Sequence, residues 1–328
     1  MPVPSVLKDR LRLPAIGSPM FIISTPDLVI AQCKAGIIGS FPALNARPAE
    51  ALDDWLARIR EELAAHDAAH PGRPSAPFAV NQIVHRSNNR LERDLEVCIR
   101  HKVPVIITSL GARPDVYEAV HAYGGIVLHD VINDRFARKA IEKGADGLIA
   151  VAAGAGGHAG TLSPIALVQE IRRWWDGPLA LAGAIATGRA VLAARAMGAD
   201  LAYIGSAFIA TEEANAPPDY KAMVVAAGAE DIVYTNSFSG VHGNYLRPSI
   251  RRAGLDPDAL EAADPSRMDV SKARAWRDVW SAGQGVGALD AVVPAAALVE
   301  RLCREYETAL GEAAAEWSRR LGRGDPAP

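Results

Sequence analysis

The sequence predicts an α/β protein, a (β/α)8 barrel that carries one long inserted segment after its eighth strand. Short, almost continuously apolar runs alternate with longer amphipathic segments, a pattern typical of parallel strands buried on both faces. Eight such runs fall within about 200 residues, the span of one barrel, and 328 residues leave room for an insertion. A doubly wound open sheet is the alternative, but about five or six strands would fit it better.

The expected strands and helices alternate along the first two thirds of the chain. Strands are expected at residues 16–23, 37–41, 78–83, 105–109, 126–129, 148–152, 179–184 and 201–204. Helical patterns lie at residues 48–65, 90–101, 113–123, 134–143, 164–175 and 189–197. A last amphipathic helix, at residues 296–319, is expected to pack on the outside of the barrel.

The alternation stops after Ile209, where prolines and Gly-rich turns separate short helical patterns. Long excursions of this kind usually form lids or binding loops. We therefore expect residues 1–210 and 280–320 to form the barrel. Residues 211–279 are expected to form a lid-like inserted segment that covers the active site.

Composition and charge exclude several classes of protein. The chain is 49% hydrophobic and 22% charged, which permits a large core, and its net charge of −3 favours neither nucleic acid nor an anionic membrane. Cys33, Cys98 and Cys303 are far apart, as expected for reduced thiols. There is no apolar signal-peptide core and no run near 18 apolar residues. We expect a cytoplasmic protein that contacts no membrane.

The Gly-rich run at residues 154–161 is the strongest functional signal, because it follows an apolar strand and contains His158. Glycines let the backbone approach a ligand closely, and an imidazole titrates near neutral pH. His158 is therefore the candidate general acid or base, the alternative being a surface histidine in a flexible loop. A metal pair of His158 with His129-Asp130 lacks any supporting ligand motif, so no metal is expected.

Other polar or small residues also follow expected strands. In a barrel the carboxyl ends of the strands converge on the active site, and a phosphate is often bound after the last two strands. The Gly-rich turns at residues 182–188 and 204–207 thus predict a phosphate-bearing ligand. The candidates after the strands are Asn81, Ser109, His129, Asp130, His158, Gly183, Gly205 and Ser206.

Several motifs together resemble one family. Residues 155–161, 181–189, 197–200, 204–211 and 280–285, with the opening Ser18-Pro19-Met20, are similar to nitronate monooxygenases, formerly called 2-nitropropane dioxygenases. Flavin-dependent enoyl-acyl-carrier-protein reductases and NADH:quinone reductases share these motifs. The resemblance covers nearly the whole chain.

The resemblance implies a TIM barrel with non-covalent FMN that oxidises alkyl nitronates, and by extension nitroalkanes, with O2 to carbonyl compounds and nitrite. His158 would be the active-site base or the electrostatic partner of the nitronate. A homodimer is compatible with the resemblance, and no nucleic-acid partner is expected. The residues expected to contact FMN are Pro19, Met20, Phe21, Asn81, Ser109, His129, Gly157, Ala182, Gly183, Gly205, Ser206 and Gln284.

The chain departs from the family pattern at three places. Ala184 stands where relatives often have a second glycine, Ala207 where they often have an arginine, and His129-Asp130 where some have a lysine. That lysine would stabilise reduced flavin, so its absence leaves the flavin potential and the substrate open. Two alternative functions remain. One is an FMN-dependent NAD(P)H reductase with a quinone or enoyl-thioester acceptor, and the other is a non-catalytic flavin-binding barrel.

Overall fold

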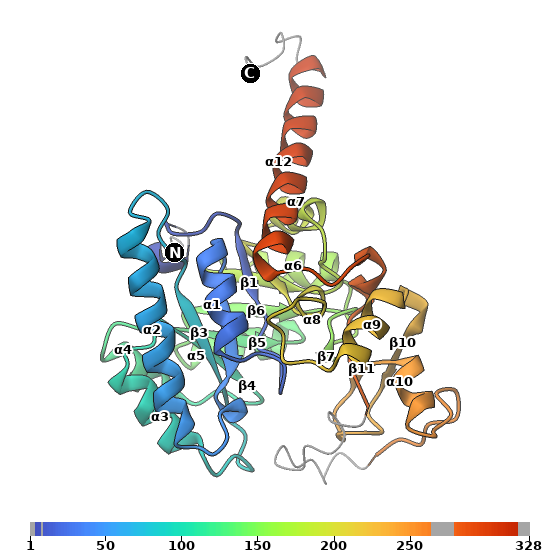
Figure 1. Ribbon diagram of the computed structural model, residues 1–328, viewed down its shortest axis with the longest axis horizontal. Coiled ribbons are helices and arrows are strands. Elements are labelled where there is room, and N and C mark those ends of the chain that lie inside the picture. The colour runs from blue at the N-terminus through green and yellow to red at the C-terminus, as the bar shows by residue number, and fades with distance from the viewer. Residues whose placement is uncertain (1–3, 8, 264–278, 321–328) are drawn as a thin grey trace.

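A computed structural model describes residues 4–7, 9–263 and 279–320, and its centre is a parallel eight-stranded sheet surrounded by helices (Figure 1). The strand order is β1-β9-β8-β6-β5-β4-β3-β2. A parallel bridge between Ile16 and Ile38 joins the first and last strands of this order, with Gly17 N–H donating to Ile38 O at 2.7 Å. The sheet is therefore closed, and the predicted (β/α)8 barrel is confirmed.

Each expected strand has a counterpart in the barrel. The strands are β1 Ala15–Gly17, β2 Gly39–Pro42, β3 Phe78–Ile83, β4 Val105–Ser109, β5 Ile126–Val131, β6 Gly147–Val151, β8 Leu179–Ala182 and β9 Leu201–Ile204. The first differs most from its expected bounds, 16–23, because it ends at Gly17. Beyond it the chain turns, with Met20 N–H donating to Ser24 Oγ at 2.9 Å, so this apolar run leaves the sheet.

Most helices cover the outside of the barrel, and the two within residues 211–263 belong to the inserted segment. They are α1 Pro26–Ala35, α2 Ala51–Ala69, α3 Leu91–Arg100, α4 Pro114–His121, α5 Asp134–Glu142, α6 Pro164–Arg172, α7 Gly188–Met197, α8 Ser206–Ile209, α9 Pro218–Ala226, α10 Arg247–Arg252 and α12 Ala295–Arg320. Helix α1 was not expected from the periodicity, although Pro26 in its first turn and Gly36 just past its end mark it. Among the described helices, none is both long and apolar enough to cross a membrane.

The core has an inner and an outer layer, and the alternation of side chains along each strand decides which layer a residue joins. On β4, Val105 and Ile107 point into the barrel and pack with Leu128 and Ile149. Ile106 points outward and packs in the layer that includes the flanking helices. The same alternation continues to the carboxyl ends of the strands, where it selects the polar groups that face the barrel interior.

A second, three-stranded sheet joins the inserted segment to the Gly-rich loop. Its order is β10-β11-β7, where β10 is Ile232–Thr235, β11 is Gly243–Leu246 and β7 is Gly157–His158. Figure 1 shows β10 grouped with α9 and α10 on one side of the barrel. Residues 264–278 of the expected insertion lie outside the described residues. The described part of the segment therefore pairs directly with the strand that carries His158.

Gly188, the first residue of α7, tests the packing of α12 on the barrel. A Cβ at this position would overlap the carbonyl oxygen of Leu302 and the amide nitrogen of Tyr306, both in α12. Backbone atoms cannot move aside as the end of a flexible side chain can. We therefore expect Gly188→Ala to lower the free energy of unfolding by about 1–3 kcal/mol. Urea denaturation followed by circular dichroism measures the change.

Gly311→Ala is the matched control, since Gly311 lies in α12 and a Cβ added to it would meet no atom within 4 Å. Alanine has the higher helix propensity, so this variant should be more stable by up to about 1 kcal/mol. Equal effects from the two substitutions would show that α12 does not pack against Gly188 in solution.

Candidate active site

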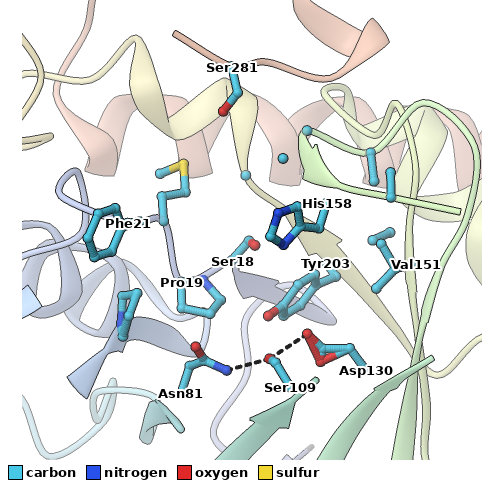
Figure 2. A pocket seen from close by; sticks show the side chains of 18 of the residues that line it. Ser18, Pro19, Phe21, Asn81, Ser109, Asp130, Val151, His158, Tyr203 and Ser281 are labelled. Atoms are coloured by element: carbon cyan, nitrogen blue, oxygen red, sulfur yellow. Dashed lines mark hydrogen bonds between the residues drawn. The ribbon is translucent and has the colours of Figure 1, made fainter. Parts of the chain in front are cut away.

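One cavity of about 930 Å³ opens at the carboxyl ends of the barrel strands (Figure 2). Its wall combines the loop after β1, the ends of β3 to β5, the Gly-rich loop, the turns after β8 and β9, and residues 239–242 of the inserted segment. It brings together nearly all the candidates, namely Pro19, Met20, Phe21, Asn81, Ser109, His129, Gly157, His158, Ala182, Gly183, Gly205 and Ser206. Gln284 is exposed and does not line the cavity; its backbone N–H donates to Gly154 O at 2.9 Å.

A chain of polar groups crosses the inner end of the cavity, as the dashed lines in Figure 2 show. Asn81 Nδ2 donates to Ser109 Oγ at 2.7 Å, and Ser109 Oγ donates to Asp130 Oδ2 at 2.6 Å. Asp130 Oδ1 is buried and has no hydrogen-bond partner among the described residues. Burial raises the pKa of Asp130 to about 6, against the opposing effect of the Ser109 hydrogen bond. This carboxyl can therefore exchange a proton close to neutral pH.

His129 lies on the opposite face of β5 from Asp130. Its Nδ1 is 2.7 Å from Thr108 Oγ1 and 3.2 Å from the Tyr117 hydroxyl, in the layer between the barrel and α4. Burial, with a smaller effect of Lys143, lowers the pKa of His129 to about 4. Asp130, rather than His129, presents its side chain to the barrel interior. The inward apolar residue at 128 already indicates this, because residue 130 shares its face.

The loop that carries Pro19, Met20 and Phe21 is held in a strained conformation. Ile22 has a φ of +68°, which a β-branched side chain rarely adopts. Its N–H donates to Asn45 Oδ1 at 2.9 Å, and Asn45 Nδ2 donates to Met20 O at 3.0 Å and to Ser24 O at 2.8 Å. Asn45 thus offsets the strain by satisfying three backbone groups of the loop.

Asn215, in the inserted segment, holds the same loop from the other side. Its Nδ2 donates to Ile22 O at 3.0 Å, across 193 residues of sequence. Neither Asn45 nor Asn215 was among the residues predicted from the sequence, since neither stands next to an expected strand end. No local signal marks them, because each is defined only by a partner distant in the chain.

The Gly-rich loop is fixed by segments that come late in the sequence. The Gly157 and His158 backbones pair with Asn244 and Gly243 of β11, and Asn244 Nδ2 donates to Ala155 O at 2.6 Å. A Cβ on Gly156 would lie 2.8 Å from the amide nitrogen of Gly283, so only glycine fits there. The loop glycines therefore serve a close approach between two backbone segments as well as access to the cavity.

The His158 side chain lies in the cavity wall (Figure 2), and the residue as a whole is half-buried. Its Nε2 is 3.0 Å from Ser239 Oγ of the inserted segment. The surrounding protein desolvates the ring and lowers the pKa of His158 to about 4. The imidazole is therefore neutral at physiological pH.

Tyr203 of β9 also lines the cavity and was not among the sequence candidates (Figure 2). Burial raises its pKa well above the ordinary value, and the nearby Asp130 adds to that effect. The phenol is therefore a neutral hydrogen-bonding group. Within the described ranges, no cluster of three or more His, Cys, Asp or Glu residues could hold a metal ion.

Comparison with known sequences gives a consistent result. The family model for nitronate monooxygenase matches residues 6–305. The protein Rv1533 of Mycobacterium tuberculosis, named as a monooxygenase, is 31% identical over 237 residues, which are 66% of this chain and 63% of that protein. The nitronate monooxygenase of Paraburkholderia phytofirmans is 26% identical and is aligned over 90% of this chain and 93% of its own length.

Solved structures share the architecture. The nitroalkane oxidase of Streptomyces ansochromogenes superposes with a TM-score of 0.79 at 26% identity, over 94% of this chain and all of that one (100%). FabK from Thermotoga maritima superposes with a TM-score of 0.76 at 26% identity, over 94% of this chain and 96% of that one.

The buried, neutral state of His129 predicts an acid-sensitive contribution to stability. The unfolded chain protonates this ring near the ordinary value of 6.5, whereas the folded chain resists protonation down to a pKa of about 4. The unfolded state thus binds more protons in this window, so the contribution of His129 to stability falls as pH falls from about 7 to 4. His158 acts in the same direction and Asp130 in the opposite one.

The His129→Asn variant isolates this effect, because asparagine can accept the same hydrogen bonds but does not titrate. As pH falls from 7 to 4, the free energy of unfolding of the variant minus that of the parent should therefore rise by up to about 3 kcal/mol. Urea titrations of both proteins at a series of pH values measure the difference. A difference that stays constant across the series would contradict a buried, neutral His129.

Proposed function

Because the chain belongs to the nitronate monooxygenase family, we propose that it is an FMN-dependent oxidoreductase that converts alkyl nitronates and nitroalkanes with O2 to carbonyl compounds and nitrite. The observation that carries the proposal is the position of His158 in the wall of a cavity of about 930 Å³ at the carboxyl ends of the barrel strands. We also propose that residues 1–210 and 280–320 act as the cofactor-binding barrel. Residues 211–279 would then shape the substrate end.

The residues around the cavity fit FMN. Pockets for drug-sized ligands span about 300–1,000 Å³, so this volume accommodates a cofactor together with a small substrate. Gly183, Gly205 and Ser206 would hold the phosphate, since they follow the last two barrel strands and carry little or no side chain. Asp130 Oδ1, buried and without a hydrogen-bond partner among the described residues, supplies an acceptor that a ring N–H of the flavin would satisfy.

The bound flavin would supply electron transfer from the nitronate to O2, while the protein supplies position and proton transfer. Pro19, Met20 and Phe21 would lie beside its ring, on the loop that Asn45 holds. Asn81 would offer its amide oxygen to the flavin ring, because its amide nitrogen Nδ2 already donates a hydrogen bond to Ser109. These groups orient the ring and keep water from one side of it.

His158 decides which substrates can enter the reaction. A pKa of about 4 leaves the imidazole neutral and able to accept a proton. It can therefore take the α-proton of a neutral nitroalkane and so generate the nitronate within the cavity. A preformed nitronate needs no base, and for it the neutral ring would serve as a hydrogen-bond partner. The structure favours the base role over a permanently charged imidazolium.

A second candidate function is an FMN-dependent reductase that uses NAD(P)H. The cavity lining includes Lys139 and Lys143 at the end of α5, and Arg113 before α4, whose guanidinium pairs with Asp115. A positively charged rim suits the anionic tail of a nicotinamide nucleotide or of a thioester acceptor. The likeness to FabK is in line with this alternative.

Anaerobic mixing of the FMN-loaded protein with each electron donor separates the two candidates. Under the leading proposal, a nitronate or primary nitroalkane bleaches the flavin absorbance at least as fast as the enzyme turns over, and NADH alone does not bleach it. Oxygen uptake and nitrite release follow when air is admitted. Fast bleaching by NADH, with no oxygen uptake on nitronate, would instead establish the reductase. A protein that retains no flavin after reconstitution would overturn both candidates.

Substitution of His158 tests its catalytic role. His158→Asn should lower kcat with a nitroalkane by about 10²–10⁴-fold, because a positioned base contributes that much. Its rate with a preformed nitronate should fall much less, since no α-proton has to be removed. Flavin absorbance should stay unchanged, and His66→Asn, a half-buried change on α2 outside the cavity lining, should leave both rates unchanged. An equal loss on both substrates would argue against a base.

A further inference from the structure

We propose that Ser239 is a positioning residue that fixes the ring orientation and the tautomer of His158. Ser239 belongs to the inserted segment, and the catalytic consequence of its contact rests on the proposed function. The geometric basis is the 3.0 Å contact between Ser239 Oγ and His158 Nε2, which spans 81 residues of sequence.

Strand pairing brings Ser239 to this place. In the β10-β11-β7 sheet, Gly243 of β11 lies directly opposite His158. The turn between β10 and β11 therefore passes beside the ring, and Ser239 stands within that turn. Two further bonds tie the inserted segment to Ala159: its N–H donates to His242 O of the turn at 3.3 Å, and the hydroxyl of Tyr234, in β10, donates to Ala159 O at 2.9 Å.

The hydrogen-bond pattern of Ser239 assigns a direction to the contact. A hydroxyl has one proton, and the Ser239 hydroxyl donates it to Val241 O at 2.9 Å. Its oxygen is then an acceptor for His158, so the proton of the contact belongs to Nε2. A neutral imidazole carries one N–H, and the basic lone pair of the ring consequently belongs to Nδ1. Ser239 thus selects the tautomer.

The same contact can persist through proton transfer. When Nδ1 of His158 accepts a proton, Nε2 keeps its own proton and still donates to Ser239 Oγ. The ring therefore need not turn between the neutral and the charged form. Because the ring does not have to rotate on the way to the transition state, no part of the reaction barrier is spent on reorienting the base.

The arrangement differs from that of a serine nucleophile. A nucleophilic serine donates its proton to the histidine that activates it, whereas Ser239 donates to a backbone carbonyl. The turn that carries Ser239 is also held by packing, since the rings of Phe238 and Tyr245 pack edge to face with their centroids 4.8 Å apart. Both features fit a residue whose role is to orient its neighbour.

Nitrogen NMR of the full-length, ¹⁵N-histidine-labelled protein tests the tautomer without any turnover. The His158→Asn spectrum identifies the His158 signals by their loss. We expect the parent to show the Nε2–H tautomer, Ser239→Ala to show a mixture or the Nδ1–H tautomer, and Ser239→Thr, which keeps the hydroxyl, to restore the parent pattern. An Nδ1–H tautomer in the parent would overturn the proposal whether or not either variant folds, and so would an unchanged pattern in a folded Ser239→Ala protein.

Kinetics of the FMN-loaded enzyme provide the second readout. Ser239→Ala should lower kcat with a nitroalkane by about tenfold, the rate equivalent of one hydrogen bond, with KM little changed and with recovery in Ser239→Thr. A loss in KM alone would contradict a positioning role. If the NMR result holds while no nitro compound is turned over, the tautomer assignment stands and the proposed function fails.

Discussion

Closure of the barrel is the constraint on which the rest of the structure depends. Once the bridge between Ile16 and Ile38 joins the two outer strands of the sheet, every barrel strand has one face inside and one face outside. Apolar side chains fill the barrel interior along most of each strand. At the carboxyl ends of the strands, polar side chains that point to the same inner face take their place. Asn81, Ser109 and Asp130 form their chain because three adjacent strands present the same face.

The closed barrel also supports local conformations that would not persist alone. Ile22, Leu110 and Ala184 all have positive φ angles, and all three line the cavity. Such conformations cost about 1–3 kcal/mol each, and rigid surroundings must offset that cost. At Ile22 the offset comes from the side chains of Asn45 and Asn215. Strain gathered around one cavity is typical of a site whose backbone is arranged for a ligand.

Burial then assigns the protonation states of the site. Desolvation raises the pKa of Asp130 to about 6 and lowers the pKa of His158 to about 4, so the usual order of the two pKa values is inverted. At neutral pH the imidazole is uncharged, whereas a carboxyl with a pKa of about 6 is still mostly ionised and becomes neutral only below that pH. The uncharged imidazole is able to accept a proton from a bound group.

Local patterns in the sequence determined the barrel, its strands and His158, because each depends on residues that are close together in the chain. Alternating apolar runs predict strands, and a glycine run after a strand predicts a ligand loop. Partners far apart in the chain were decided only by the tertiary structure. Asn215 reaches Ile22 across 193 residues and Ser239 reaches His158 across 81 residues, so no local pattern marks either contact. Asp130 lies between these cases. The sequence places it on the same face of β5 as residue 128, but only the closed barrel makes that face the interior.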